Sequence, residues 1–369
     1  MKYRIKRKLF QIFKNDTIAK LLTPLCFLPF LLVYQIKKLF VKNMAIDISD
    51  SRAKLEEIYP NKVEMPYGNG YDFEAEYDIS VIIPCYNVEN YINECVNSVL
   101  NQKGNLKIEV ICVNDGSTDN TLKLLKEYGD KIKVLDKQNG GAAAARNTAL
   151  DEAKGRYIFF LDSDDYITPE CLEECYKTLV NKNMDVVSVG YCMLRNNNLL
   201  PCIGNGFCCG RLFKREIFNK YRFPINNVFE DSVRPFIINS IVKNECHINI
   251  LHYIYRANEN GITGNIKKSV KGIGHLWVVE CLAEINRENN LSSKEDLYKL
   301  VLSHFGSLFY ERTKSFDKEI RQAIFLVACE ILKKYYVKNV KKLSFAQRQI
   351  EKYLLKQNFA KWELACKWL

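Results

Sequence analysis

The chain has 369 residues, with 54 lysines and arginines against 43 aspartates and glutamates, which gives a formal net charge of +11. Hydrophobic residues make up 47% and charged residues 26%. These values are close to globular averages, so they exclude general disorder, a collagen-like fibre and a polytopic membrane protein. At about 100–200 residues per domain, the length predicts two domains or one large α/β domain with an appendage.

Most of the positive charge lies in residues 1–43, which carry ten basic residues and one acid. The rest of the chain has a net charge of only +2, so we expect no nucleic-acid partner. The uncharged run 21–36 is flanked by lysines. It is shorter than the roughly 20 residues of a spanning helix, and we expect Pro24 and Pro29 to interrupt helical hydrogen bonding. We predict that 1–43 associates with an anionic membrane surface. A true span and a segment docked on the soluble domain remain alternatives.

Residues 44–76 contain scattered Pro and Gly and indicate a linker with a short helix at Ser51–Ile58. From Tyr77, apolar runs typical of strands alternate with helical stretches. The predicted strands are 79–83, 108–113, 132–135, 157–161 and 186–189, and the predicted helices are 88–100, 121–128, 142–153 and 169–180. This alternation indicates an α/β domain with a mostly parallel sheet covered by helices on both faces.

Beyond residue 268 the strand pattern gives way to helical periodicity. We therefore predict an α/β domain over 77–268 and a C-terminal helical subdomain over 269–369. The fourteen cysteines are scattered and form no C-x-x-C pair, and the four histidines do not complete a zinc site. Such thiols are typical of a reducing, cytoplasmic environment.

Polar loops follow four of the predicted strands, and in a doubly wound sheet ligands bind beyond the carboxyl ends of the strands. The four loops include Pro84-Cys85-Tyr86-Asn87, the acidic turn at Asp115, the run ending in Arg146-Asn147, and Asp162-Ser163-Asp164-Asp165. No G-x-G-x-x-G follows the first strand and no P-loop motif occurs, which disfavours a dinucleotide oxidoreductase and a P-loop NTPase.

Asp162 and Asp164 are two residues apart at a strand end, so their side chains point to the same face. Neighbouring carboxylates repel one another unless a cation or a proton compensates. One or two carboxylates, completed by water and substrate phosphate, are a usual site for Mg²⁺ or Mn²⁺. The sequence therefore predicts a divalent cation here, held by Asp162 and Asp164.

The four segments VIIPCYN (81–87), VNDGSTDNT (113–121), QNGGAAAARN (138–147) and FFLDSDD (159–165) resemble successive motifs of the inverting family 2 glycosyltransferases of bacterial surface-glycan type. The resemblance covers about residues 77–266. It implies a GT-A fold, which is Rossmann-like, and a nucleotide-sugar donor. UDP is implied through the part of the motif around Asp115.

The resemblance also implies roles for individual residues. Pro84, Tyr86 and Asn87 would border the nucleotide base, Asp115 would accept a hydrogen bond from the base, and Arg146 and Asn147 would lie near the donor. Asp162 would face the ribose and the metal, and Asp164 would be the principal metal ligand, a role that Asp165 could share. In the second half, Phe229-Glu230-Asp231 resembles the pair whose aspartate acts as the catalytic base. The chain departs from the family pattern at Arg211 and Gly261, where relatives often carry lysine and serine.

The expected function is a metal-dependent inverting glycosyltransferase that moves a sugar to a hydroxyl of a glycan or lipid-linked acceptor at the cytoplasmic membrane face, in cell-surface polysaccharide synthesis. Two alternatives stay open. A nucleotidyltransferase also uses an α/β sheet with acidic metal ligands, but PCYNVEN is not the glycine- and lysine-rich loop it would carry. A catalytically silent glycan-binding scaffold of the same fold would be expected to lack Asp164 or Asp231.

Overall fold

The computed structural model describes residues 5–6, 16–41, 50–68, 70, 74–195, 198–202, 208–256 and 269–369. All the candidate site residues named above lie within these ranges. Gly261 and its neighbours lie outside the described residues. The chain divides into two compact units, one of residues 64–258 and one of residues 1–63 together with 259–369. Each unit has its own core.

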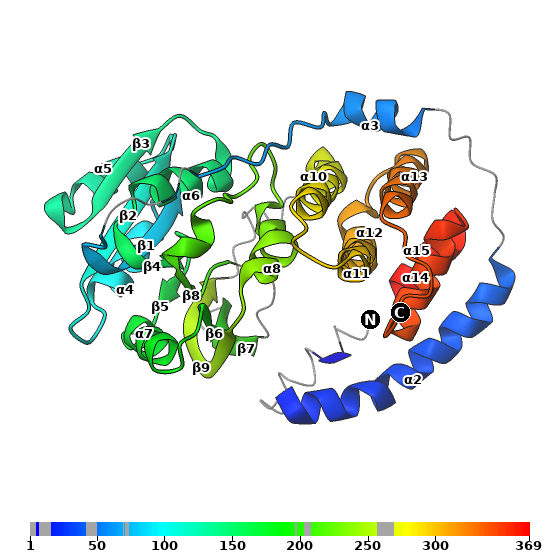
Figure 1. The fold of residues 1–369 in the computed structure, drawn as a ribbon, viewed down its shortest axis with the longest axis horizontal. Helices are drawn as coiled ribbons and strands as arrows, with labels where there is room; N and C mark the ends of the chain where they lie inside the picture. Colours follow the sequence, from blue (N-terminus) through cyan, green and yellow to red (C-terminus); the bar gives the residue numbers. More distant parts are fainter. Residues whose placement is uncertain are drawn as a thin grey trace. The chain divides into compact units, whose positions relative to one another are not determined.

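The unit of residues 64–258 is built on a sheet in which the described residues form nine strands, eight of them in the order β3-β2-β1-β4-β8-β6-β9-β5, with β7 paired to β6 (Figure 1). The strands are β1 Tyr77–Cys85, β2 Ile108–Asp115, β3 Lys133–Lys137, β4 Gly155–Phe160, β5 Tyr166–Ile167, β6 Val186–Arg195, β7 Asn198–Cys202, β8 Arg211–Lys214 and β9 Glu245–Arg256.

The first four strands of that order are mutually parallel, as the alternation of strands and helices predicts. The central run of β1, residues 79–83, is buried without interruption, which is typical of a strand covered on both faces. The other half of the sheet is mixed: β8 is antiparallel to β4 and β6, whereas β9 is parallel to β6. The sequence pattern did not indicate β5, β7, β8 or β9, because their short or partly exposed runs lack a strong apolar signal.

Helices connect the strands close to where the sequence predicts them: α4 Ile92–Leu100, α5 Thr121–Lys126, α6 Gly141–Glu152 and α7 Cys171–Asn181. Helix α6 packs on β1 and β2, and α7 packs on β6, β8 and β9. Short helical turns η1 Gly129–Lys131, η2 Arg215–Phe218, η3 Glu230–Ser232 and η4 Arg234–Ile238, then α8 Asn239–Ile241, complete the unit. The turn η3 carries the Glu230-Asp231 pair.

The second unit is helical in its described parts. It contains α2 Asp16–Phe40, α3 Ser51–Ile58, η6 Val270–Ile273, α10 Gly274–Glu288, α11 Lys294–His304, α12 Ser307–Thr313, α13 Lys318–Lys334, α14 Phe345–Leu355 and α15 Phe359–Trp368. Helix α3 has the bounds predicted from the sequence. It is held by Arg52, which forms ion pairs of 2.9 Å with both Glu280 and Glu330.

Helix α2 differs from the sequence prediction, because it continues without a break through Pro24 and Pro29. Proline in a helix interior costs about 3 kcal/mol. Packing against other helices offsets that cost here: α2 contacts α15, and Ala19 and Tyr34 are fully buried. A long uncharged run can therefore remain helical despite two prolines when one of its sides is buried.

Candidate active site

The strand-end loops meet at one edge of the parallel half of the sheet, because β2, β1 and β4 are neighbours in register. Pro84 pairs with Val113, two residues before Asp115. The amide of Leu161, next to Asp162, donates to Ile82 of β1 at 3.1 Å. Asp115 and Asp162 thus end strands two inter-strand spacings apart, about 10 Å. This separation suits a ligand that spans the edge.

The carboxylate of Asp115 is almost fully buried and joins β2 to the start of α6. Its Oδ1 accepts from the amide of Gly140 at 2.9 Å and from Lys137 Nζ at 2.8 Å, and its Oδ2 accepts from the amide of Gly141 at 2.7 Å. Gly116, at φ +71°, approaches so closely that an added Cβ would lie 2.8 Å from the Asn139 amide nitrogen. Three of the roughly four lone-pair positions of this carboxylate are therefore occupied within the fold.

Asn87 joins the first two loops. Its backbone is left-handed, with φ at 51°, a conformation that Asn tolerates better than most residues. Its side-chain Oδ1 accepts from the amide of Thr118 at 2.8 Å, and its own amide donates to Ser117 Oγ at 3.1 Å. Tyr86, by contrast, is 51% exposed. The first loop thus presents an aromatic ring to solvent from a backbone fixed by Asn87.

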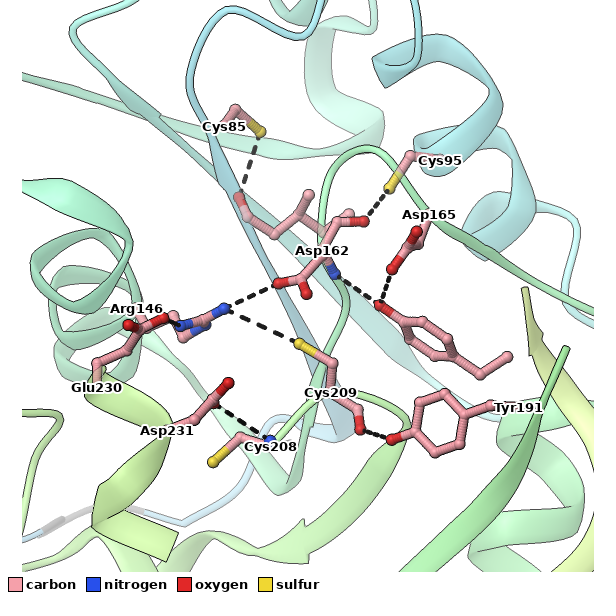
Figure 2. Close-up of polar contacts among 12 residues, drawn as sticks. Cys85, Cys95, Arg146, Asp162, Asp165, Tyr191, Cys208, Cys209, Glu230 and Asp231 are labelled. Carbon is pink, nitrogen blue, oxygen red and sulfur yellow. Dashed lines mark hydrogen bonds and ion pairs between the residues drawn. The ribbon is translucent and has the colours of Figure 1, made fainter. Parts of the chain in front are cut away.

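Arg146 connects the loop at Asp162 with the turn η3, which carries Glu230 (Figure 2). It lies on α6 with only 4% of its side chain exposed. Its Nη2 donates to Asp162 Oδ1 at 2.8 Å and its Nη1 donates to Glu230 Oε1 at 2.7 Å. The guanidinium also lies over the ring of Phe223, 5.4 Å from its centroid. One buried cation therefore holds the acidic loop after β4 next to the turn η3.

Asn147 is engaged with the backbone of a distant loop. Its amide nitrogen donates to the carbonyl of Phe223 at 2.9 Å, and its amide oxygen accepts from the Phe223 amide at 2.9 Å. Both polar ends of the side chain are therefore used within the fold. The contact fixes the segment that leads to Phe229 and η3.

The three aspartates after β4 have different environments. Asp162 is partly exposed, at 37% of its side chain, and Asp164 is partly buried, with its carbonyl accepting from Arg256 Nε at 2.9 Å. Asp165 is 1% exposed and accepts from Tyr253 Oη at 2.7 Å and from the Arg256 amide at 2.8 Å. Its burial, and then the charges of Asp162 and Asp164, raise the pKa of Asp165 well above the ordinary value.

The environments of these three aspartates indicate which of them can hold the expected divalent cation. Among the described residues, no group of three or more His, Cys, Asp or Glu side chains forms a ready metal site. Mg²⁺ and Mn²⁺ are often held by only one or two carboxylates together with substrate phosphates. Asp162 and Asp164 fit that donor set, since both are hard oxygen ligands with some exposure. Asp165 fits it less well, because both of its oxygens accept hydrogen bonds inside the fold.

Asp231 lies in η3, immediately after Glu230, which pairs with Arg146. Its Oδ1 accepts from the amide of Cys208 at 3.4 Å. Burial, followed by the charge of Glu230, raises the pKa of Asp231 to about 7. A carboxyl group with a pKa near neutrality is suited to accept and release a proton. Strongly shifted pKa values of this kind are also typical of functional sites.

Cys208, Cys209 and Tyr253 also line this region, and no sequence motif indicated their place in the site. The Sγ of Cys209 lies 3.9 Å from Arg146 Nη2, and its carbonyl accepts from the hydroxyl of Tyr191. The hydroxyl of Tyr253 accepts from the amide of Asp162 and donates to the carboxylate of Asp165. Because these residues reach the site from distant strands and loops, no local motif marks them.

The chain shares its sequence motifs with known proteins. Residues 80–192 match the family model described as glycosyl transferase family 2. The chain is 28% identical to glycosyltransferase GlyA of Streptococcus pneumoniae over 218 residues, which cover 50% of this chain and 31% of GlyA. It is 40% identical to the hyaluronan synthase of Pasteurella multocida over 173 residues, 45% of this chain and 17% of the synthase. The chain thus spans a third or less of the length of these relatives.

The fold has a counterpart among solved structures. A crystal structure of Staphylococcus aureus TarS 1–349 in complex with UDP-GlcNAc aligns with a TM-score of 0.65 and 21% identity, covering 79% of this chain and 90% of that one. This likeness concerns the fold, which is of GT-A type. Residues 80–192 thus match the glycosyl transferase family 2 model and lie within a fold of GT-A type.

Proposed function

We propose that the protein is a metal-dependent inverting glycosyltransferase that moves a sugar from a nucleotide-diphosphate sugar, a UDP-sugar, to a hydroxyl of a glycan or lipid-linked acceptor in cell-surface polysaccharide synthesis. The contact of Arg146 with both Asp162 and Glu230 carries the proposal. This contact places the acidic, partly exposed loop at Asp162, where the donor would bind, next to the carboxyl group of Asp231, whose pKa is about 7. We assign this chemistry to residues 77–268 and no chemistry to residues 269–369.

The donor would bind along the edge that runs from the first loop to Asp162. Tyr86 offers an exposed ring on which a nucleotide base can stack, with Pro84 and Asn87 holding its backbone in place. Asp115 retains one lone-pair position on Oδ2 that a base N–H can use. Asp162 and Asp164 would hold Mn²⁺ or Mg²⁺, which when bound supplies positive charge against the diphosphate.

Asp231 would act as the general base. In an inverting transfer the acceptor hydroxyl attacks the anomeric carbon as the bond to the diphosphate breaks, and the hydroxyl proton moves to a carboxylate. A positioned base of this kind typically contributes about 10²–10⁴ in rate. Arg146 positions this part of the site, because it holds Glu230, the neighbour of Asp231, next to the donor edge. Arg146 and Asn147 thus hold the segments of the site in place, in addition to lying near the donor as expected.

Several observations favour this reading over the two alternatives. Both Asp164 and Asp231 are present, which argues against a silent scaffold. The family match over residues 80–192 argues against a nucleotidyltransferase. A surface-polymer acceptor is consistent with relatives such as the minor teichoic acid biosynthesis protein GgaB of Bacillus subtilis, 33% identical over 211 residues. We place the protein on the inner face of the cell membrane, where a nucleotide-sugar donor is available.

A donor panel tests the proposal. The full chain is mixed with UDP-, GDP-, ADP- and dTDP-sugars, with and without Mn²⁺, and both the melting temperature and release of free nucleotide are measured. We expect one UDP-sugar with Mn²⁺ to raise Tm and to be slowly hydrolysed. The Asp231→Asn variant serves as the matched control, because it should retain the Tm shift and lose turnover. If the chain, given added pyrophosphate, instead converts the nucleotide-sugar to a nucleoside triphosphate and a sugar 1-phosphate, the activity is that of a nucleotidyltransferase.

A further inference from the structure

Helix α2 carries a continuous stripe of exposed aliphatic side chains. Its members recur at intervals of three and four residues, so they lie on one side of the helix. They are 51–81% exposed: Leu25, Leu28, Leu32, Ile36 and Leu39. No charged residue occurs between positions 21 and 36. A stripe of this length on a protein surface is uncommon unless something covers it.

The opposite side of α2 is docked on the C-terminal helices of the same unit. Ala19, Thr23 and Tyr34 are buried. The hydroxyl of Tyr34 lies 3.1 Å from the hydroxyl of Tyr353 on α14, and Lys37 Nζ lies 4.5 Å from the centroid of the Trp368 ring on α15. The contacts with α14 and α15 therefore lie in the C-terminal part of α2, at Tyr34 and Lys37.

This docking decides between a spanning helix and one that lies along a membrane. Helix α2 is long and apolar enough to cross a bilayer, over Leu22–Leu39. In that position, however, its buried side would have to leave α14 and α15, which carry charged residues such as Glu351 and Lys361. A helix that keeps the contacts of Tyr34 and Lys37 can enter a bilayer only with its outer stripe, parallel to the surface.

The charge of the segment that contains α2 indicates what covers the aliphatic stripe. Residues 1–43, which contain α2, have a net charge of +9. A second copy of this chain would bring an equal positive charge against it, which opposes a dimer through this face. A bilayer containing anionic lipids offers both apolar depth for the aliphatic side chains and negative charge for the flanking lysines.

We propose that α2 is an in-plane membrane anchor whose Leu25–Leu39 stripe enters one leaflet of an anionic bilayer while its other side stays docked on α14 and α15. The inference rests on the membrane-face location proposed above and adds the residues and the orientation. It differs from attachment by the basic residues alone, which requires no aliphatic stripe.

The first test is sedimentation of the full chain with phosphatidylcholine vesicles containing phosphatidylglycerol. Replacing Leu25, Leu28 and Leu32 by Gln keeps a good helix former at each exposed position. The partition coefficient of the protein onto the vesicles should fall at least about 30-fold. The matched control replaces three other exposed leucines, Leu199, Leu200 and Leu308, and should bind as the native protein does. Vesicles of phosphatidylcholine alone should bind the native protein more weakly.

The second test is the depth of α2. In a Cys26→Ser background, a bimane is attached at Leu25→Cys or at Leu39→Cys and quenched by brominated lipids. An in-plane helix gives similar depths at both positions, whereas a spanning helix separates them by about 20 Å.

The outcomes separate the inference from the wider proposal. Unequal depths, or undiminished binding by the triple Gln variant, would overturn the in-plane anchor while leaving membrane association in place. Absence of any vesicle binding by the native chain would reject both the anchor and the membrane-face location. A change in molecular mass of the triple variant without a change in vesicle binding would assign the stripe to a dimer. Glycosyl transfer, measured on the same samples without vesicles, is independent of all of these results.

Discussion

Replacing Asp231 by Asn should stabilise the protein at alkaline pH while abolishing turnover. Burial and the neighbouring Glu230 raise the pKa of Asp231 from an ordinary value of 3.8 to about 7. The folded protein therefore holds this proton more tightly than the unfolded chain does. The stability that results is fully present below pH 4 and is lost as the pH rises through 7. Asn does not ionise, so the variant does not undergo this loss.

The magnitude follows from the two pKa values. Between pH 5 and pH 8 the ionisation of Asp231 in the folded state costs about 2–3 kcal/mol more than in the unfolded chain. For a domain of this size, that corresponds to about 4–12 °C in melting temperature. The Tm of Asp231→Asn minus the Tm of the native protein should therefore grow by that amount from pH 5 to pH 8. The Oδ1 of Asn can still accept from the Cys208 amide, so this hydrogen bond is retained.

Asp185 provides a control of opposite sign. Despite partial burial, its hydrogen bonds to Lys214 and to the amides of Lys243 and Asn244 lower its pKa. Its contribution to stability is present above the unfolded pKa and is lost as pH falls through the folded value. The Asp185→Asn variant should thus melt below the native protein at both pH values. If the Tm difference for Asp231→Asn were the same at pH 5 and pH 8, the raised pKa, and with it the argument for a poised base, would be refuted.

Five further substitutions, in three tests, examine other parts of the site. Glu230→Gln removes the charge that contributes second to the raised pKa of Asp231. The rise of kcat/KM with pH, expected to be about tenfold between pH 6 and pH 8 in the native enzyme, should therefore move to lower pH; an unmoved profile would show that Asp231 does not govern it. Asp164→Ala should eliminate the Mn²⁺-dependent part of donor binding in calorimetry, whereas Asp165→Asn should retain it, since both oxygens of Asp165 accept hydrogen bonds inside the fold; equal losses in both variants would restore Asp165 as a metal ligand. Arg146→Lys, which keeps the charge but not the two-sided contact with Asp162 and Glu230, should lower kcat/KM by about tenfold or more, while Arg156→Lys on the exposed side of β4 should leave it unchanged.

The parts of the site that the sequence revealed are those encoded by strand ends. Because parallel strands in register finish at one edge, an apolar run followed by polar residues is enough to place Asp115 and Asp162 on the same rim. The alternation of strands and helices was likewise sufficient to predict the parallel half of the sheet. These are local signals, and each can be read within about ten residues.

The partners of those residues are a different matter, because they depend on contacts between distant segments. Asn147 bonds to the backbone of Phe223, 76 positions away, and Asp165 accepts from Tyr253, 88 positions away. Nothing in the four motifs distinguishes an aspartate that faces solvent from one that faces Tyr253. The mixed half of the sheet escaped prediction for a related reason: β8 and β5 are only four and two residues long, too short for a periodic pattern.

The pKa values of Asp165 and Asp231 are raised for the same reason, which is burial close to other carboxylates. Each carboxyl group is buried and lies near other carboxylates, Asp162 among them. Arg146 offsets part of this charge through its contacts with Asp162 and Glu230, and the remaining negative charge opposes the approach of an anionic diphosphate. A cation that arrives with the donor would relieve the repulsion among the aspartates and lower the pKa of Asp231. In the proposed reaction, Asp231 would thereby be deprotonated when the donor is in place, and donor binding would prepare it to accept the acceptor's proton.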